Sequence, residues 1–573
     1  MDFKKIFPKI QTFLVNSIDL CKFFTQEQLE TQAFSFKNSE LIDSLRLLLK
    51  SKTMLLFLSD ESFKKSEVFN CFNLEIEALI DKFIKLDNIF ELQEKAPKSK
   101  NLQFTLENSN TLTIYLRLLS YFRTATPELE EFFLYFTLDS DIDNAVFENY
   151  SLANNLNVHF SIAKEKEAFG QWEFTSIPRI RYFKLFFKHC LRFGELFLYS
   201  LNSEKAQNWL PDMKSFCLSF IEEVASLDNQ LILPVNFFSE KLDRIFLSAE
   251  NINFKGNIKE KGLLMNFFKY LNSIEAKNQL HSIELLLKNC GIVNFYDDFE
   301  GFFKALSKSY EKLRHLRFQI PGLQVQDEDF QQRFLLLNLK SLKSLDLNLE
   351  STGISSKTMR ILADFIGTNK FLESLSLMLR NNTIMDLSGL FKVITKDNLP
   401  NLKSIKLYLH KTQLSNKTLE NLGTSLSHFP EEVTDFKIDL EDNKLTSENK
   451  DLFSQIAKGL GHKFKKLKSL QFHMVKCQLG KLEILEFLRE IYQIKAENLL
   501  FFDLGKNKAF WESEWSPSEL EMLSEALERD FQTPKLRLEF TALKNYKKNP
   551  TLFHTLEKIQ GKPRKNLELK MKF

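Results

Sequence analysis

The side chains of this sequence that could carry catalysis or bind a metal ion are few and widely spaced. His473 and Cys477 are four residues apart, a spacing that would join two ligands on one helix face. The surrounding pattern instead predicts a strand and a turn, and no further ligand accompanies them. His189 and Cys190 are adjacent, so on a strand they would face opposite sides. We therefore expect neither a metal site nor a catalytic dyad at these positions.

Sequence motifs that mark common catalytic or cofactor sites are absent. The chain contains no GxxxxGKS or GxxxxGKT loop for phosphates, no HExxH zinc motif, no GxSxG nucleophile turn and no GxGxxG dinucleotide turn. Each of these motifs carries a specific arrangement of backbone and side chains that the chemistry requires. We therefore expect a protein that is not an enzyme and that uses no cofactor and no metal ion.

Two local features could contact a partner. Trp511 and Trp515 flank an acidic stretch, and they could anchor an interface if exposed or pack beneath a loop if buried. Near the C-terminus, Lys562, Arg564 and Lys565 form a small basic cluster. This cluster could touch phosphate groups or could be the solvated end of the fold. A nucleic-acid partner is thus a weakly supported alternative.

Composition favours an ordinary folded protein. Apolar residues make up 43% of the chain and charged residues 27%, which is enough apolar surface to fold. The 78 basic and 75 acidic residues leave a net charge of +3, too small to indicate a nucleic-acid or membrane partner. Six dispersed cysteines fit reduced thiols, and no apolar run reaches the roughly 18 residues of a membrane span. We expect a soluble, cytoplasmic protein.

A repeat organises the C-terminal half. Similar segments begin at steps of 30 to 34 residues, at Leu342, Leu372, Leu402, Val433, Leu467 and Leu499. Each alternates apolar and polar residues, as at Leu345, Leu347 and Leu349, which predicts a strand with one buried face. Helical spacing follows, as at Met359, Leu362 and Ile366, with Ser355 and Ser415 at expected N-cap positions of two helices.

A short polar residue stands between strand and helix in each unit. These residues are Thr352, Asn382, Thr412, Asn443, Cys477 and Asn507. The unit resembles the leucine-rich repeat of the long, ribonuclease-inhibitor-like class. That resemblance implies an α/β solenoid, or horseshoe, with parallel inner strands and outer helices. It also implies that the Asn, Thr or Cys side chain bonds to buried backbone groups, which makes Cys477 structural.

The repeat extends upstream with less regular spacing, and phenylalanine often replaces leucine. Strands are predicted from Leu313, Leu280, Leu242, Met213 and Ile180, and more weakly from Leu156, Leu129 and Asn101. Closing strands are predicted from Thr533 and Asn566. We therefore divide the chain into a mostly helical N-terminal cap (1–100), degenerate repeats (101–310) and clearer repeats with C-terminal capping strands (311–573).

The inner face of such a solenoid suits protein binding. Polar strand positions would align there in two columns. One column is Asn348, Met378, Tyr408, Asp439 and His473, and the other is Asp346, Ser376, Lys406, Lys437 and Gln471. Aromatic residues and Met are enriched in interface cores, although any one of these side chains could simply be solvated.

We therefore expect a non-enzymatic scaffold that holds a protein partner of unknown identity on its concave sheet. One alternative is a structural subunit of a large assembly, ciliary or ribonucleoprotein, in which the helices make the contacts. Another is a regulator of a small GTPase, because some ribonuclease-inhibitor-like repeats are GTPase activators. That activity would need a suitable loop residue, and the sequence identifies none.

Overall fold

A computed structural model describes the chain from residue 101 onward, with gaps. The described residues are 101–106, 131–138, 155–162, 181–188, 198, 201, 210–226, 238, 241–253, 263–273, 276, 279–290, 292, 295–308, 310–337, 339–445, 452–464, 466–529, 535–541, 549–561 and 567–572. The predicted helical cap, residues 1–100, lies outside them. The chain divides into two compact units. One comprises Met1–Ala225, Asn229–Ser248 and Lys261–Asn266, and the other Ser226–Asp228, Ala249–Glu260 and Phe267–Phe573.

The first unit contains a parallel sheet. Its strands are β1 (Asn101–Leu106), β2 (Glu131–Leu138), β3 (Asn155–Ile162), β4 (Tyr182–Lys188) and β5 (Ser215–Ser226). Each pairs in parallel with the next along the chain. The sequence predicted all five strands, including the three weaker ones, and all are confirmed. Strand β6 (Arg244–Asn253), also predicted, runs across the division between the units.

Phenylalanine fills the interior of β4 and β5. Phe183 and Phe187 on β4 are in register with Phe216 and Phe220 on β5, and all four are fully buried. The rings of Phe187 and Phe220 stack with their centroids 5.1 Å apart. Burying such a side chain stabilises a fold by about 1.5–3 kcal/mol. Phenylalanine therefore occupies here the positions that leucine occupies in the clearer repeats.

The second unit alternates strands and helices. Its strands are β7 (Ser282–Lys288), β8 (His315–Gln319), β9 (Ser344–Asn348), β10 (Ser374–Met378), β11 (Ser404–Tyr408), β12 (Asp435–Asp439), β13 (Ser469–His473), β14 (Leu499–Asp503), β15 (Leu536–Thr541) and β16 (Leu567–Lys572). Each pairs in parallel with the next. The two closing strands, β15 and β16, are confirmed.

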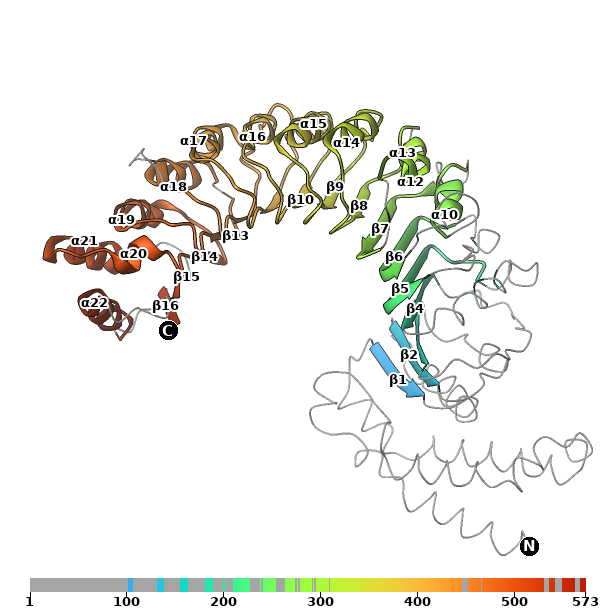
Figure 1. Ribbon diagram of the computed structural model, residues 1–573, viewed down its shortest axis with the longest axis horizontal. Coiled ribbons are helices and arrows are strands. Elements are labelled where there is room, and N and C mark those ends of the chain that lie inside the picture. Colours follow the sequence, from blue (N-terminus) through green and yellow to red (C-terminus); the bar gives the residue numbers. More distant parts are fainter. Residues whose placement is uncertain are drawn as a thin grey trace, which may run out of the picture. The chain divides into compact units, whose positions relative to one another are not determined.

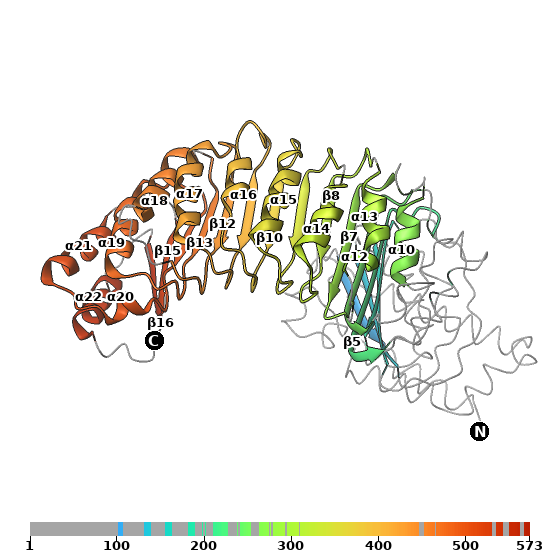
Figure 2. The same cartoon turned by 45° about the horizontal axis from the view of Figure 1, so that its top comes forward.

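The helices of this unit all lie on one side of its sheet (Figures 1 and 2). They are α12 (Phe295–Asp298), α13 (Glu300–Leu306), α14 (Asp327–Phe334), α15 (Ser356–Gly367), α16 (Ser388–Val393), α17 (Asn416–Ser425), α18 (Leu452–Lys463), α19 (Lys481–Glu490), α20 (Lys508–Glu512), α21 (Pro517–Glu528) and α22 (Pro550–Gln560). Helix α10 (Leu263–Leu271) crosses the division, and 3-10 turns Leu426–His428 and Ile491–Gln493 extend α17 and α19. An all-parallel open sheet alternating with helices is consistent with a solenoid.

Strand alternation and helix capping both follow the sequence. On β9, Leu345 and Leu347 are buried while the residues between them are half-buried. Ser355 caps α15 because its side chain accepts from Lys357 N. Ser415 also occupies an N-cap position, but its hydroxyl donates to Met385 O in the preceding repeat. The two predicted N-cap positions are confirmed, and of the two side chains only that of Ser355 accepts from a backbone amide of its own helix.

A ladder of buried side chains joins consecutive repeats where each strand ends. Asn382 donates to the carbonyls of Leu349 and Leu379 at 2.7 and 2.9 Å. Its Oδ1 accepts from the backbone amides of Thr352 and Gly353 at 3.1 and 2.9 Å. Asn443 and Asn507 make similar bonds two and four repeats further along the chain. The bonds that the resemblance implied are therefore present.

Cys477 occupies a ladder position and is structural. Its thiol donates to Leu440 O at 3.0 Å and is fully buried, and burial raises its pKa well above the usual thiol range. At the equivalent position of an earlier repeat, burial raises the pKa of Cys290 to about 12. Both thiols remain protonated near neutral pH. Because the thiolate is the nucleophile and the metal ligand, neither sulfur is available for that chemistry.

Candidate functional site

The sheet of the second unit has one face that its helices do not cover. The pairing registers align Asn348, Met378, Tyr408, Asp439 and His473 across β9 to β13. The same registers align Asp346, Ser376, Lys406, Lys437 and Gln471 beside them. Both predicted columns are confirmed as rows of spatial neighbours. We call these two rows, with the residues two positions beyond each strand end, the inner face.

Tyr408 on β11 lies between two cations of the inner face. The guanidinium carbon of Arg380 is 5.1 Å from the centroid of the Tyr408 ring, and Lys437 Nζ is 4.9 Å from it. Each such contact contributes about 0.5–1 kcal/mol at an exposed site. Arg380 continues across β11 to β12, where its Nη2 is 3.2 Å from Asp439 Oδ2. The half-buried ring is therefore flanked by side chains from both neighbouring repeats, which restrict its movement.

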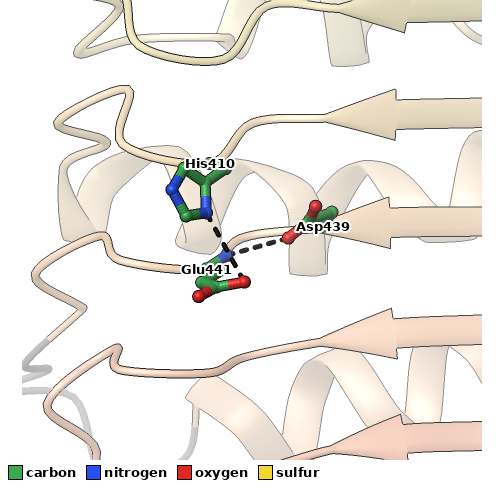
Figure 3. A group of neighbouring side chains, drawn as sticks. All are labelled: His410, Asp439 and Glu441. Carbon is green, nitrogen blue, oxygen red and sulfur yellow. Dashed lines mark hydrogen bonds and ion pairs between the residues drawn. The ribbon is translucent and has the colours of Figure 1, made fainter.

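A histidine and two carboxylates lie close together where β11 and β12 end (Figure 3). His410 follows β11, Asp439 ends β12, and Glu441 lies in the turn after β12. One potential ligand atom from each lies within 4.8 Å of the others. Asp439 is 7% exposed, and its Oδ1 accepts from Glu441 N at 3.1 Å. Among the described residues, no other group of three His, Cys, Asp or Glu side chains meets in this way.

His473 closes the same row on β13. Its ring contacts the edge of Phe501 with centroids 5.0 Å apart, and burial lowers its pKa. Its Nε2 atom is buried and has no hydrogen-bond partner among the described residues. Because the lowered pKa favours the neutral imidazole, this side chain adds a polar but uncharged surface near pH 7.

The remaining predicted residues of the inner face are less tightly held. Asn348 Oδ1 accepts from Glu350 N at 3.0 Å, and Met378 is half-buried. Lys406 is exposed beside Lys437 on the next strand. Burial raises the pKa of Asp346, although Arg317, whose Nε is 3.2 Å away, opposes that shift. Side chains of both charge signs therefore lie on the inner face.

The two predicted tryptophans are buried within the chain. Trp511 is 2% exposed and Trp515 is 8% exposed. Phe510 contacts both indoles edge-on, with centroids 5.4 and 5.2 Å away. Trp515 Nε1 donates to Phe510 O at 3.2 Å. These contacts favour the packing alternative over an exposed interface anchor.

Other residues singled out by the sequence cannot be placed. His189, Cys190 and the basic cluster at Lys562, Arg564 and Lys565 lie outside the described residues. The spacing of His473 and Cys477 gives no joint site, because the Cys477 thiol is buried and bonded to backbone.

Sequence reasoning missed three residues of the inner face. Arg380, His410 and Glu441 each follow a buried leucine that ends the apolar alternation of its strand. Their side chains therefore emerge on the same side as the columns. Continuing the period-two pattern by one more pair of residues would have identified all three.

No protein-family model matches the chain, and no curated protein shows significant similarity to it. In the part of the chain that the structure describes, no helix is both long enough and apolar enough to cross a membrane. The inner face is therefore the main structural indication of function.

Proposed function

We propose that this chain is a leucine-rich-repeat protein of the ribonuclease-inhibitor-like class. We further propose that the inner face of its second unit binds a protein partner without catalysing a reaction. The buried Thr, Asn and Cys residues along the ladder support the repeat class, because each bonds a strand-end carbonyl of its own or of the preceding repeat.

The observation that carries the binding proposal is Tyr408 between Arg380 and Lys437. Tyr and Arg are enriched among residues that dominate interface energies, particularly where neighbouring groups exclude water. A ring that is already oriented loses little side-chain entropy on binding. The strands beneath it are held by the sheet and ladder, so the surface is preorganised.

The distribution of charge on the inner face favours a protein partner over a nucleic-acid partner. Lys406 and Lys437 lie close to Asp346, Asp439 and Glu441 rather than within a continuous basic stripe. Nucleic-acid binding draws most of its affinity from uninterrupted cations facing phosphates. A partner with both acidic and basic side chains would match this mixed surface.

Two methionines provide a matched test of the binding face. Met378 lies on the inner face, whereas Met385 is 57% exposed in the loop before α16. The full chain, as wild type, Tyr408→Asp, Met378→Asp or Met385→Asp, would be immobilised and exposed to native extract. The bound proteins would then be quantified by mass spectrometry. We expect one protein to be recovered by wild type and Met385→Asp, and to fall at least about 10-fold, or 1.4 kcal/mol, with the other two.

Equal recovery by all four proteins would exclude the inner face as the binding surface. Failure of the wild type to retain any stoichiometric protein would contradict the scaffold proposal as a whole. Thermal unfolding of each variant would establish that the lost binding does not arise from misfolding.

Exposed apolar residues support a second candidate, a structural subunit of a larger assembly. Leu335, Leu336 and Phe371 are 61, 51 and 59% exposed and lie in consecutive loops between helix and strand. Exposed apolar patches often mark interaction sites. If Leu336→Asp and Phe371→Asp release a partner that Tyr408→Asp retains, this edge makes the contact instead of the inner face.

A further inference from the structure

His410, Asp439 and Glu441 come from two adjacent repeats whose relative position is fixed. Leu409 N donates to Asp439 O at 2.7 Å, and Lys411 N donates to Glu441 O at 3.0 Å. The backbone on both sides of His410 is therefore bonded to the two residues that carry the carboxylates. The backbone positions that carry the three side chains are therefore fixed before a ligand arrives.

The two carboxylates are already oriented by neighbouring groups. Arg380 Nη2 lies 3.2 Å from Asp439 Oδ2, and Glu441 N donates to Asp439 Oδ1. Lys476 Nζ is 3.7 Å from Glu441 Oε1. The other oxygen, Glu441 Oε2, faces His410 Nδ1 at 3.5 Å. Each carboxylate therefore keeps lone pairs for a further ligand, while the cations act as outer groups that hold it in place.

These separations suit a small transition-metal ion. Two ligands bound at about 2.1 Å to a tetrahedral ion lie about 3.4 Å from each other. His410 Nδ1 and Glu441 Oε2 already have nearly this separation. One potential ligand atom from each of the three residues lies within 4.8 Å of the other two, so binding would draw these atoms closer together.

The donor atoms of the three side chains indicate which metal ion would bind. An imidazole nitrogen with two carboxylate oxygens suits Zn²⁺, whereas Mg²⁺ and Ca²⁺ prefer ligand sets made of oxygen alone. Three protein ligands leave at least one coordination position for water or another donor. Because Arg380 and Lys476 offset the two carboxylate charges, the affinity should be moderate.

A second histidine lies on the strand next to the group. His473 is in register with Asp439 on the neighbouring strand, and its buried Nε2 has no hydrogen-bond partner among the described residues. Buried polar atoms in native proteins are usually satisfied by protein, water or an ion.

We propose that His410, Asp439 and Glu441 bind one divalent transition-metal ion of the Zn²⁺ class at the edge of the inner face. This site does not include His473 or Cys477. It does not depend on the proposed protein partner, because all three ligands belong to this chain.

Zinc binding by the purified full-length chain tests the proposal directly. After chelator treatment and dialysis, isothermal titration with ZnCl₂ would be performed on wild type, His410→Ala, Glu441→Gln and His554→Ala. His554 is an exposed histidine on α22 and serves as the matched control. We expect about one ion per chain in wild type and in His554→Ala, with at least about 10-fold weaker binding in the other two.

Competition with MgCl₂ separates this site from a simple acidic surface. Millimolar Mg²⁺ should leave zinc binding nearly unchanged, because the imidazole selects against it. Undiminished zinc binding by both His410→Ala and Glu441→Gln, or no zinc binding by the wild type, would overturn the proposal. Circular dichroism of the metal-free variants would show whether they remain folded, and Asp439→Asn would provide an additional ligand variant if either of them does not.

Discussion

At the scale of single residues, each ladder asparagine satisfies several buried backbone groups at once. Asn443 donates to Leu409 O and Leu440 O, and its Oδ1 accepts from the amides of Thr412 and Leu414. The side chain is 1% exposed, so its loss would leave these four backbone groups in the interior without their partner. A smaller side chain at this position cannot reach all of them.

Replacing Asn443 with alanine should lower the free energy of unfolding by about 3–5 kcal/mol, because buried unsatisfied groups each cost about 1–3 kcal/mol. Asn443→Thr should cost less, since threonine keeps a hydroxyl that can donate to the strand-end carbonyl, as Thr412 does to Leu409 O. Urea unfolding followed by fluorescence would measure both changes. Exposed Asn401 is the control, and its alanine variant should change stability by less than about 0.5 kcal/mol. An equal loss of unfolding free energy in Asn443→Ala and Asn401→Ala would contradict the structural role of the ladder.

The sequence predicted residues well where their role depends on position along one strand. The ladder positions and the two inner-face columns follow from a fixed period, and the structure places both accordingly. The sequence did not predict side-chain contacts that depend on how neighbouring repeats are placed. The approach of Arg380 to Tyr408 and Asp439 requires the registers of three strands and one particular side-chain direction. Nothing in the local pattern encodes that direction.

At the scale of elements, the strands were easier to predict than the packing of the segments between them. Period-two alternation survives the replacement of leucine by phenylalanine, so even β1 to β3 could be located. Tryptophan burial was harder, because a WxxxW spacing is compatible with either an exposed loop or a packed one. The contacts of Phe510 with both indoles distinguish the packed arrangement from the exposed one.

Loops between helix and strand are linked by an ion-pair bridge. Glu373 lies 2.8 Å from Lys343 Nζ and 2.9 Å from Lys403 Nζ, in the preceding and following repeats. Hydrogen bonds from both lysines lower the pKa of Glu373 from 4.5 to about 2. Because the folded-state pKa is depressed, the stabilisation is fully present above pH 4.5 and is lost as pH falls towards 2.

Glu373→Gln should therefore reduce stability at pH 7 by less than about 1 kcal/mol, since these side chains are partly exposed and screened by water. The difference between wild type and variant should shrink between pH 4.5 and 2, and also in about 1 M NaCl at pH 7. Chemical unfolding across this pH series provides the measurement. A difference that persists at pH 2 and in high salt would show that Glu373 acts through packing instead of charge.

At the scale of the whole molecule, the division into two compact units has an energetic consequence. In a solenoid, stability is close to a sum of the repeats and their nearest-neighbour interfaces. A defect in one repeat should therefore weaken its neighbours strongly and distant repeats little. The broken ladder in Asn443→Ala is a suitable local defect, because its lost bonds join only the repeats of β11 and β12.

Hydrogen exchange of Asn443→Ala, compared with wild type and Asn401→Ala, should locate that weakening. We expect faster amide exchange in β11, β12 and β13 of the second unit, because the ladder bonds of these strands are lost or adjoin the defect. Strands β4 and β5 of the first unit should keep their wild-type protection. Equal acceleration in β4 and β5 would instead mean that both units unfold in one cooperative step. In that case a ligand bound to the inner face would stabilise the entire chain, whereas with independent units it would protect the second unit alone.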